Sequence, residues 1–149
     1  YQQIELLKKN LKAVAVGITA GVFTSLLGVF LLSKLFALNH VQYVTLLPKS
    51  ITTAIGMDVS RDLGGIEAIT VAVIIITGIL GNMSAEFICK IFKIHEPVAK
   101  GLAIGTASHA IGTAKAMEIG EIEGAVSSLA IAVAGLMTVL GASVFANLM

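Results

Sequence analysis

The sequence predicts an all-α polytopic membrane protein with three spanning helices plus two broken or re-entrant helical segments arranged as an inverted repeat. Three observations lead to this fold class. Of the 149 residues, 56% are hydrophobic and 13% are charged, and the mean hydropathy is +0.95, whereas soluble domains carry roughly 25% charged residues. Three uncharged runs are long enough to cross a bilayer. A short polar motif also occurs twice in the segments between them.

The uncharged runs are Ala13–Ser33, Ala68–Ala85 and Gly124–Met149. About 20 residues of helix cross the hydrocarbon core, and we expect the spans to cover about 13–33, 68–85 and 124–147. The first run follows lysines, as in a signal peptide, but it is too long for a signal h-region and has no obvious cleavage site. Because the chain begins at Tyr1 and not at Met, we expect residues 1–149 to be a single membrane domain from the C-terminal part of a longer chain.

Two other segments, about 41–62 and 101–120, are apolar at their flanks and polar near the middle. The first contains Pro48 and Lys49, and the second contains His109 among several glycines. Each apolar flank is too short to span a bilayer alone. Polar backbone at membrane depth is tolerated only where protein or a water-filled cavity surrounds it. Both segments are therefore predicted to be broken or re-entrant helices.

The two broken segments share a motif at a constant offset of 56 residues. Thr52-Thr53-Ala54-Ile55-Gly56 aligns with Ser108-His109-Ala110-Ile111-Gly112, and six of the sixteen positions from Thr52 to Glu67 are identical. Chance agreement is the alternative in a chain rich in Ala, Ile and Gly. The matches nevertheless include a charged residue and keep register across a gap. We therefore favour the duplication of a unit made of one broken segment and one spanning helix.

The lysines predict the orientation of the chain. The positive-inside bias places two lysine-bearing flanks in the cytoplasm, and their lysines are Lys8, Lys9, Lys12, Lys90, Lys93 and Lys100. The first two spans already make a round trip between these flanks, so the broken segment between them must enter and leave on one side. A repeated unit of one re-entrant segment and one crossing is inverted in the membrane. The two breaks are thus predicted to face each other near the midplane, as in secondary transporters.

The residues at the breaks are suited to binding an anion. Pro48 suits the first turn of a helix, and the free amides of the next three residues would then point toward the break. A helix N-terminus carries a partial positive charge that favours a carboxylate, and Lys49 adds a full charge. The candidate hydroxyl ligands are Ser50, Thr52, Thr53, Thr106, Ser108 and Thr113. Gly105 and Gly112 would let the backbone come close to a ligand.

Each of these groups also has a structural interpretation. Ser and Thr inside membrane helices often bond to their own backbone. Lys49 would alternatively reach the membrane interface or pair with Asp58 or Asp62. His109 is costly in lipid, so we expect it to face a cavity or a partner. It is either a neutral structural histidine or a ligand contact and proton carrier.

Other residues are expected to carry no chemistry. Cys89 has no second cysteine to pair with and is expected to be a buried apolar residue. The three histidines show no HExxH-like spacing and no nucleophile–base pair is evident, so we expect no metal site, no cofactor and no enzyme. The net charge of +1 gives no reason to expect nucleic acid as a partner. Lys115 and Glu118 are three residues apart and are expected to form a local helix pair.

The stretches LLPKSITTAIGMDVSRDLGGIEAIT and GTASHAIGTAKAMEIGEIEGAVSSLA resemble the two signature stretches of the LrgB/CidB family. The resemblance covers nearly the whole chain, and its Pro-Lys-Ser-x-Thr-Thr and Ser-His-Ala-x-Gly-Thr-Ala motifs are quite specific. Family members are longer, with further N-terminal helices. Their first motif commonly continues Pro-Ile-Ala, where this chain has Ala54-Ile55-Gly56. The resemblance therefore does not extend to a proline-enforced kink at Ala54.

This resemblance implies two kinds of function. Bacterial members are described as antiholin-like or holin-like proteins that modulate murein hydrolase activity and lysis together with a small LrgA/CidA-type membrane protein. Others are similar to carriers of small carboxylates, namely glycolate and glycerate in plastids and pyruvate in bacteria. Carried over by position, the substrate-binding candidates are Pro48, Lys49, Ser50, Thr52, Thr53, Ser108, His109, Gly112 and Thr113. His109 is also the candidate for proton coupling.

We therefore expect a bacterial multi-pass cell-membrane protein that carries a small monocarboxylate bound between two broken helices. The alternative is an antiholin-like regulator of murein hydrolase activity and cell lysis. The expected partners are the lipid bilayer, a small carboxylate anion, the LrgA/CidA-type protein and further copies of the chain in a homo-oligomer.

Overall fold

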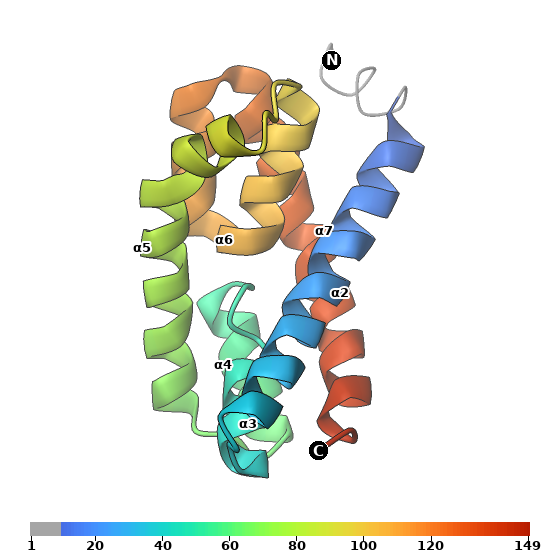
Figure 1. Cartoon of the computed structure of the whole chain (residues 1–149), viewed down its shortest axis with the longest axis vertical. Coiled ribbons are helices and arrows are strands. Elements are labelled where there is room, and N and C mark those ends of the chain that lie inside the picture. Colours follow the sequence, from blue (N-terminus) through green and yellow to red (C-terminus); the bar gives the residue numbers. More distant parts are fainter. Residues whose placement is uncertain (1–9) are drawn as a thin grey trace.

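The computed structural model describes residues 10–149, and the regular structure within that range is entirely helical. Six helices follow one another: α2 (Leu11–Leu35), α3 (His40–Leu46), α4 (Thr53–Asp62), α5 (Glu67–Ile91), α6 (Pro97–Ile119) and α7 (Glu121–Ala146). Lys8 and Lys9, which help to predict the orientation of the first span, lie outside the described residues. Figure 1 shows α2, α5 and α7 running the length of the molecule, with the shorter helices packed between them.

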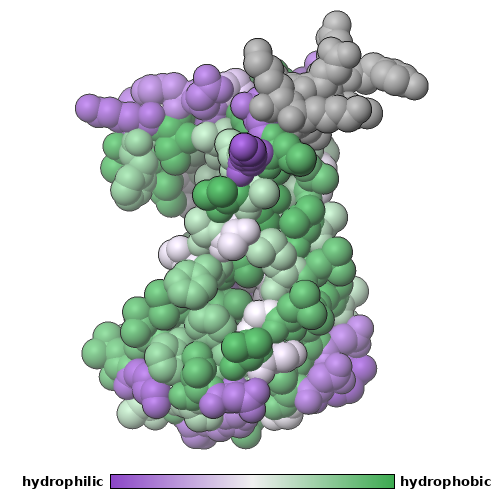
Figure 2. Space-filling model, turned by 90° about the vertical axis from the view of Figure 1, so that its right-hand side faces the viewer, coloured by the Kyte–Doolittle hydropathy of each residue, from purple (hydrophilic) through white to green (hydrophobic). Residues whose placement is uncertain are grey.

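The three long helices confirm the predicted spans. They have 25, 25 and 26 residues, and at 1.5 Å per residue each is longer than the hydrocarbon core, which is about 30 Å thick. Protein buries only 22–33% of their most apolar windows. The remaining apolar faces gather in a broad band between two polar ends (Figure 2). The chain is therefore a multi-pass membrane protein.

The first broken segment forms a helical hairpin. α3 begins with a capping box in which Asn39 and Gln42 satisfy each other's backbone amides. It ends at Leu46, and a non-helical link over residues 47–52 separates it from α4. α4 then returns antiparallel to α5, because Gly56 packs on Ile74 while Ser60 bonds to Thr70. The predicted interruption is present, and its link lies near mid-height (Figure 1).

The second broken segment reverses direction at one residue. α6 contains a single non-helical residue, His109, with φ 42° and ψ −141°. Before it, Gly101 lies against Glu123 and Gly105 against Ser127, so this arm is parallel to α7. After it, Thr113 meets Ser127 while Met117 meets Gly124, so that arm is antiparallel to α7. The two arms thus return to one end of the molecule, opposite to the end from which α3 and α4 enter (Figure 1).

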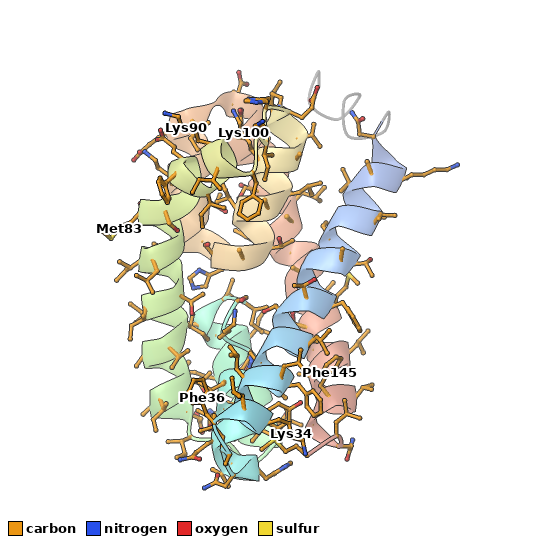
Figure 3. All side chains as sticks on the ribbon, in the orientation of Figure 1. Lys34, Phe36, Met83, Lys90, Lys100 and Phe145 are labelled. Atoms are coloured by element: carbon orange, nitrogen blue, oxygen red, sulfur yellow. The ribbon has the colours of Figure 1, made fainter. Side chains whose placement is uncertain are left out.

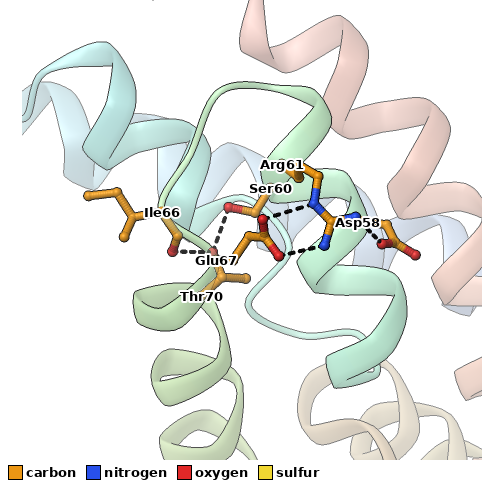
Figure 4. A network of polar contacts seen from close by, with 6 residues as sticks. All are labelled: Asp58, Ser60, Arg61, Ile66, Glu67 and Thr70. Carbon is orange, nitrogen blue, oxygen red and sulfur yellow. Dashed lines mark hydrogen bonds and ion pairs between the residues drawn. The ribbon is translucent and has the colours of Figure 1, made fainter.

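Buried polar contacts fix the base of the first hairpin. Thr70 donates its hydroxyl hydrogen toward the Ser60 hydroxyl at 2.7 Å and the Thr45 carbonyl at 2.9 Å. The Thr45 hydroxyl in turn accepts a bond from the Ile66 amide at 2.9 Å. The Arg61 guanidinium donates two hydrogen bonds to the Glu67 carboxylate, from Nη2 at 2.6 Å and from Nε at 2.8 Å. Figure 4 shows the Ser60–Thr70 and Arg61–Glu67 contacts joining α4 to the start of α5.

Candidate functional site

Two cavities meet at the level of the breaks. The α2 cavity has a volume of about 580 Å³, and its lining includes Ser25, Lys49, Ser50 and Thr106. The α5 cavity has a volume of about 280 Å³, and its lining includes Thr77, Ser84 and Ser108 as well as Lys49. Lys49 and Ala107 line both cavities. The first break therefore places Lys49 close to the second break, which contributes Ala107 to both cavities. Figure 2 shows that the surface of the molecule is indented at mid-height.

Among the residues that the structure describes, Lys49 is the only charged one that lines either cavity. Its ammonium donates to the Ser50 hydroxyl at 2.9 Å, and the Ser50 hydroxyl lies 3.1 Å from that of Ser25 on α2. Within residues 10–149 no carboxylate lies within ion-pair distance of this ammonium: the ion pairs there are formed by Arg61 and Lys115, and Asp58 pairs with Arg61. Pairing of Lys49 with Asp58 or Asp62, one of the structural interpretations, is therefore wrong. A half-buried, uncompensated cation between apolar helices is costly and favours a bound anion.

The expected role of Pro48 as the start of a helix is also wrong. Pro48 is buried in the link, and the amides of Lys49 and Ile51 donate to the carbonyls of Leu46 and Pro48 at 3.2 and 3.3 Å. These tight turns occupy amides that were expected to face the break. α4 begins five residues after Pro48, with Thr52 as its N-cap residue. The backbone of the link therefore positions Lys49 without itself offering a ring of free amides.

Thr52 and Thr53 lie at the start of α4, outside the lining of both cavities. Thr52 makes no side-chain capping bond, and its carbonyl accepts the first helical bond, from Gly56 at 2.8 Å. Both side chains are half-buried. Their predicted role in binding is not supported by this geometry, although the motif places them only three and four residues after Lys49.

His109 and Ser108 form the turn of the second break. Both are buried, with exposed fractions of 3% and 4%, and the Nδ1 atom of His109 contacts the Ser108 carbonyl oxygen. Ser108 lines the α5 cavity, whereas His109 lines neither cavity. The His109 ring instead packs beside Gly78 on α5, where an added methyl group would collide with it. This geometry favours the structural interpretation of His109.

The other predicted residues beside the second break are held by hydrogen bonds and packing within the protein. The Thr113 hydroxyl donates to the His109 carbonyl at 3.0 Å and lies 2.6 Å from the Ser127 hydroxyl. Thr106 bonds to the Leu102 carbonyl at 2.7 Å, which is the self-bonding expected of hydroxyls in membrane helices. Gly112 is buried against Ser108 and Ile104. Only Thr106 among these three also borders a cavity.

Sequence reasoning missed the contributions of α2 and α5. Ser25 and Thr24 border the α2 cavity, and Thr77 and Ser84 border the α5 cavity. Asn82 supports the second break, because its amide donates to the carbonyl of Ile111 at 2.8 Å, two residues after the kink at His109. Asn82 is the only side-chain amide in the run Ala68–Ala85, and polar groups inside spans are costly unless paired. That signal would have identified it.

An ion-pair cluster joins α5 to the second hairpin. The Lys115 ammonium lies 2.6 Å from Glu86 and 3.1 Å from Glu118. The predicted Lys115–Glu118 pair is thus confirmed, and Glu86 is an additional partner. Hydrogen bonds to Glu86 and then Glu118 raise the pKa of Lys115, so it stays charged at neutral pH. Cys89 is buried as expected, and residues 10–149 contain no cluster of metal-ligating side chains.

Comparison with known proteins identifies the family. The family model described as "LrgB-like family" matches residues 1–148. The chain belongs to the LrgB-like family. Two of its relatives are named antiholin-like protein LrgB, from Bacillus cereus (strain B4264) and Bacillus anthracis (strain CDC 684 / NRRL 3495), and each is 37% identical over 140 residues. This LrgB-like chain is covered to 94% by these matches but spans only 61% of the length of each relative. No solved structure matches it.

Proposed function

We propose that this LrgB-like chain binds a small monocarboxylate at Lys49 and carries it across the membrane. The observation on which this rests is the uncompensated ammonium at the junction of two cavities. A pyruvate, glycolate or glycerate anion would pair with Lys49 and accept bonds from Ser50 and Ser25, which already lie in a chain of contacts of 2.9 and 3.1 Å. Bonds to a charged group contribute about 1.5–3 kcal/mol each. The aliphatic walls of the cavities would exclude competing water.

The proposed transport rests on treating the two hairpins as an inverted repeat. The hairpin of α3 and α4 precedes α5, the hairpin of α6 precedes α7, and the two hairpins enter from opposite ends (Figure 1). In secondary transporters such repeats place the binding site near the midplane and expose it alternately to each side. Here α2 and α5 would move relative to the hairpins, opening the α2 cavity or the α5 cavity in turn.

The distribution of basic residues supports one orientation. Five described lysines lie toward the end with the link between α5 and α6: Lys12 at the start of α2, Lys90 in the last turn of α5, Lys93 in the link, Lys100 near the start of α6, and Lys115, which pairs with Glu86 on α5. At the opposite end, Lys34 and Arg61 lie in the last turns of α2 and α4. By the positive-inside bias, we propose that the lysine-rich end faces the cytoplasm and that residues 1–149 form one membrane domain of this orientation.

Uptake of labelled pyruvate, glycolate and glycerate into proteoliposomes tests the carrier proposal. Lys49→Gln keeps the length of the side chain and removes its charge, and we expect uptake to fall at least tenfold, because about 1.5–3 kcal/mol of anion binding is lost. Lys34→Gln is the matched control, since Lys34 lies near one end of the molecule beside the Phe30 ring (Figure 3). Uptake that is absent, or that survives Lys49→Gln unchanged, would eliminate the carrier.

A second candidate function is favoured by the names of the relatives. They are antiholin-like proteins, and we propose that this chain alternatively regulates murein hydrolase activity and lysis, acting with a small LrgA/CidA-type membrane protein and as a homo-oligomer. Detergent-induced lysis rates of bacteria expressing the chain, with and without that protein, test this role. If the chain alters lysis equally well with Lys49→Gln, regulation is independent of the anion site. If Lys49→Gln removes both effects, regulation depends on transport.

A further inference from the structure

A third cavity lies at the lysine-rich end of the molecule. It has a volume of about 460 Å³ and is lined by residues from the end of α5, the following loop and both ends of α6, namely Glu86, Cys89, Lys90, Ile94, His95, Lys100, Glu118 and Ile119. We call it the vestibule. Lys90 and Lys100 lie at the same end of the molecule, near the link between α5 and α6 (Figure 3).

The vestibule adjoins the α5 cavity. Cys89 and Ile94 line both spaces, and Lys49 lies in the lining of the α5 cavity. The Ile94 amide donates to the Cys89 carbonyl at 2.8 Å, so the loop folds back over the end of α5 at this point. A wall of two small-to-medium apolar side chains therefore separates the vestibule from the cavity that leads to Lys49.

The vestibule is basic despite its two glutamates. Glu86 and Glu118 are both held by Lys115, whereas Lys90 and Lys100 form no ion pair within residues 10–149. The lining itself is neutral by count, with Lys90 and Lys100 against the two glutamates. Lys115 lies outside the lining but pairs with both glutamates, and counting it brings the local net charge to +1. A concave basic surface raises the local concentration of anions.

We propose that the vestibule is an outer anion site that receives small carboxylates from the cytoplasmic side and passes them between Cys89 and Ile94 toward Lys49. The assignment of its ligand as the transported carboxylate rests on the proposed carrier function. Lys90 and Lys100 bind the carboxylate first, and opening of the Cys89–Ile94 wall admits it to the α5 cavity.

Cys89 is the only cysteine of the chain and is therefore a ready reporter. The test measures its modification by the anionic 2-sulfonatoethyl and the cationic 2-(trimethylammonium)ethyl methanethiosulfonates, with the chain in phosphatidylcholine liposomes at low salt. Each rate is divided by the rate for the denatured chain. We expect the anionic reagent to react preferentially, and pyruvate or glycolate to slow it. A unit charge about 8 Å away in a water-like dielectric changes such a rate about two- to threefold.

Matched variants make the result specific. Lys90→Gln with Lys100→Gln should lower the rate of the anionic reagent about four- to ninefold and raise that of the cationic reagent by a similar factor, whereas Lys34→Gln at the far end should leave both rates unchanged. Ile94→Ala should raise both rates by opening the wall. Liposomes with anionic lipid distinguish a headgroup ligand, since a headgroup would protect Cys89 without any added carboxylate. Such protection, equal corrected rates for the two reagents, no reaction of the folded chain, or indifference to the lysine substitutions would overturn the proposal.

The outcome separates this proposal from that of the carrier. Labelling of Cys89 does not require transport, so its charge preference can be measured whether or not the chain carries a substrate. Lys49-dependent uptake without charge-selective labelling would refute the vestibule alone. Charge-selective labelling without any uptake would refute the carrier and retain the vestibule as an anion site.

Discussion

The two broken segments share a motif but interrupt their helices in different ways. In the first, six residues without helical structure separate α3 from α4, and they present Lys49 to two cavities. In the second, the chain turns within α6 at His109 alone, which adopts a positive φ of 42°. The aligned positions Thr53 and His109 thus begin a helix in one copy and reverse the chain in the other. A shared sequence pattern here predicts a shared location of the break and not a shared local geometry.

The difference in geometry also indicates different roles for the two breaks. The first supplies a charge, and its turns are satisfied by local backbone bonds. The second has no charged ligand group and depends on support from α5, where Asn82 bonds to Ile111 and Gly78 makes room for His109. We infer that the first break provides ligand chemistry and that the second provides a rigid wall. The following variants test that division.

Gly78→Ala should have the largest effect on stability. A Cβ atom at this position would lie 2.9 Å from the Cβ and the Cδ1 atoms of Ile111 and would also collide with the His109 ring. A backbone-attached Cβ cannot rotate away, and overpacking of this kind costs about 1–3 kcal/mol. Thermal unfolding in detergent should show a lowered melting temperature. Gly28→Ala is the control, because nothing lies within 4 Å of an added Cβ there. Equal melting temperatures for the two variants would contradict a tightly packed second break.

Asn82→Leu should have the next largest effect. The substitution keeps the size of the side chain and removes the donor of the 2.8 Å bond to the Ile111 carbonyl. Loss of one such hydrogen bond within the protein costs about 0.5–1.5 kcal/mol. Ser84→Ala, two residues further on, removes only a bond to its own helix at Leu80 and should change stability little. If the melting temperature falls equally in both variants, the amide does not support the kink.

The sequence sufficed for the overall fold because that level depends on periodicity and charge. Uncharged runs located the three spans to within a few residues at most ends, since the cost of charge in lipid limits where a span begins and ends. The interruptions at Pro48 and near His109 were also located, because Pro and polar groups are tolerated at depth only in broken segments. The motif around Pro48 also identified Lys49, which lies where the α2 and α5 cavities meet.

The site itself was predicted less well, and the reasons are local. Pro48 does not start a helix because the link needs two tight turns before the chain can reverse. His109 lies away from both cavities because its own backbone makes the turn, which directs the ring toward α5. Ser25 and Thr77 come from spans that looked purely apolar, and their approach to the breaks is set by helix packing that no local pattern encodes. The binding roles of all nine predicted site residues stay predictions.

His109→Asn should have a smaller effect and decides between the interpretations of this histidine. Asn tolerates a positive φ better than most residues, so the turn should persist without the imidazole. If His109 is structural, uptake should change less than twofold and its pH dependence should be unaltered between pH 6 and 8. His109→Val is the companion variant, since a β-branched residue is strained at positive φ and should destabilise the hairpin. Loss of proton-dependent uptake in the stably folded Asn variant would restore His109 as a proton carrier.

Arg61→Gln should have the smallest effect, although Arg61 makes one of the shortest polar contacts at the base of the first hairpin, at 2.6 Å to Glu67. The Arg61 and Glu67 side chains are 58% and 38% exposed, and exposed ion pairs contribute little because water screens them. The buried contacts of Thr70 with Thr45 and Ser60 hold α3 and α4 against α5 instead. We expect the melting temperature to fall less than in Asn82→Leu, and the difference from wild type to vanish at 1 M salt, where the screening length is about 3 Å. Thr70→Val, by contrast, should lower it at every salt concentration, because it removes the buried hydroxyl that contacts both Ser60 and the Thr45 carbonyl. If Arg61→Gln lowers the melting temperature more than Thr70→Val does, the first hairpin is held by its exposed ion pair and not by its buried hydroxyl contacts. It would then be joined to α5 in the same way as the second hairpin, where the partly exposed Lys115 ion pairs make the connection.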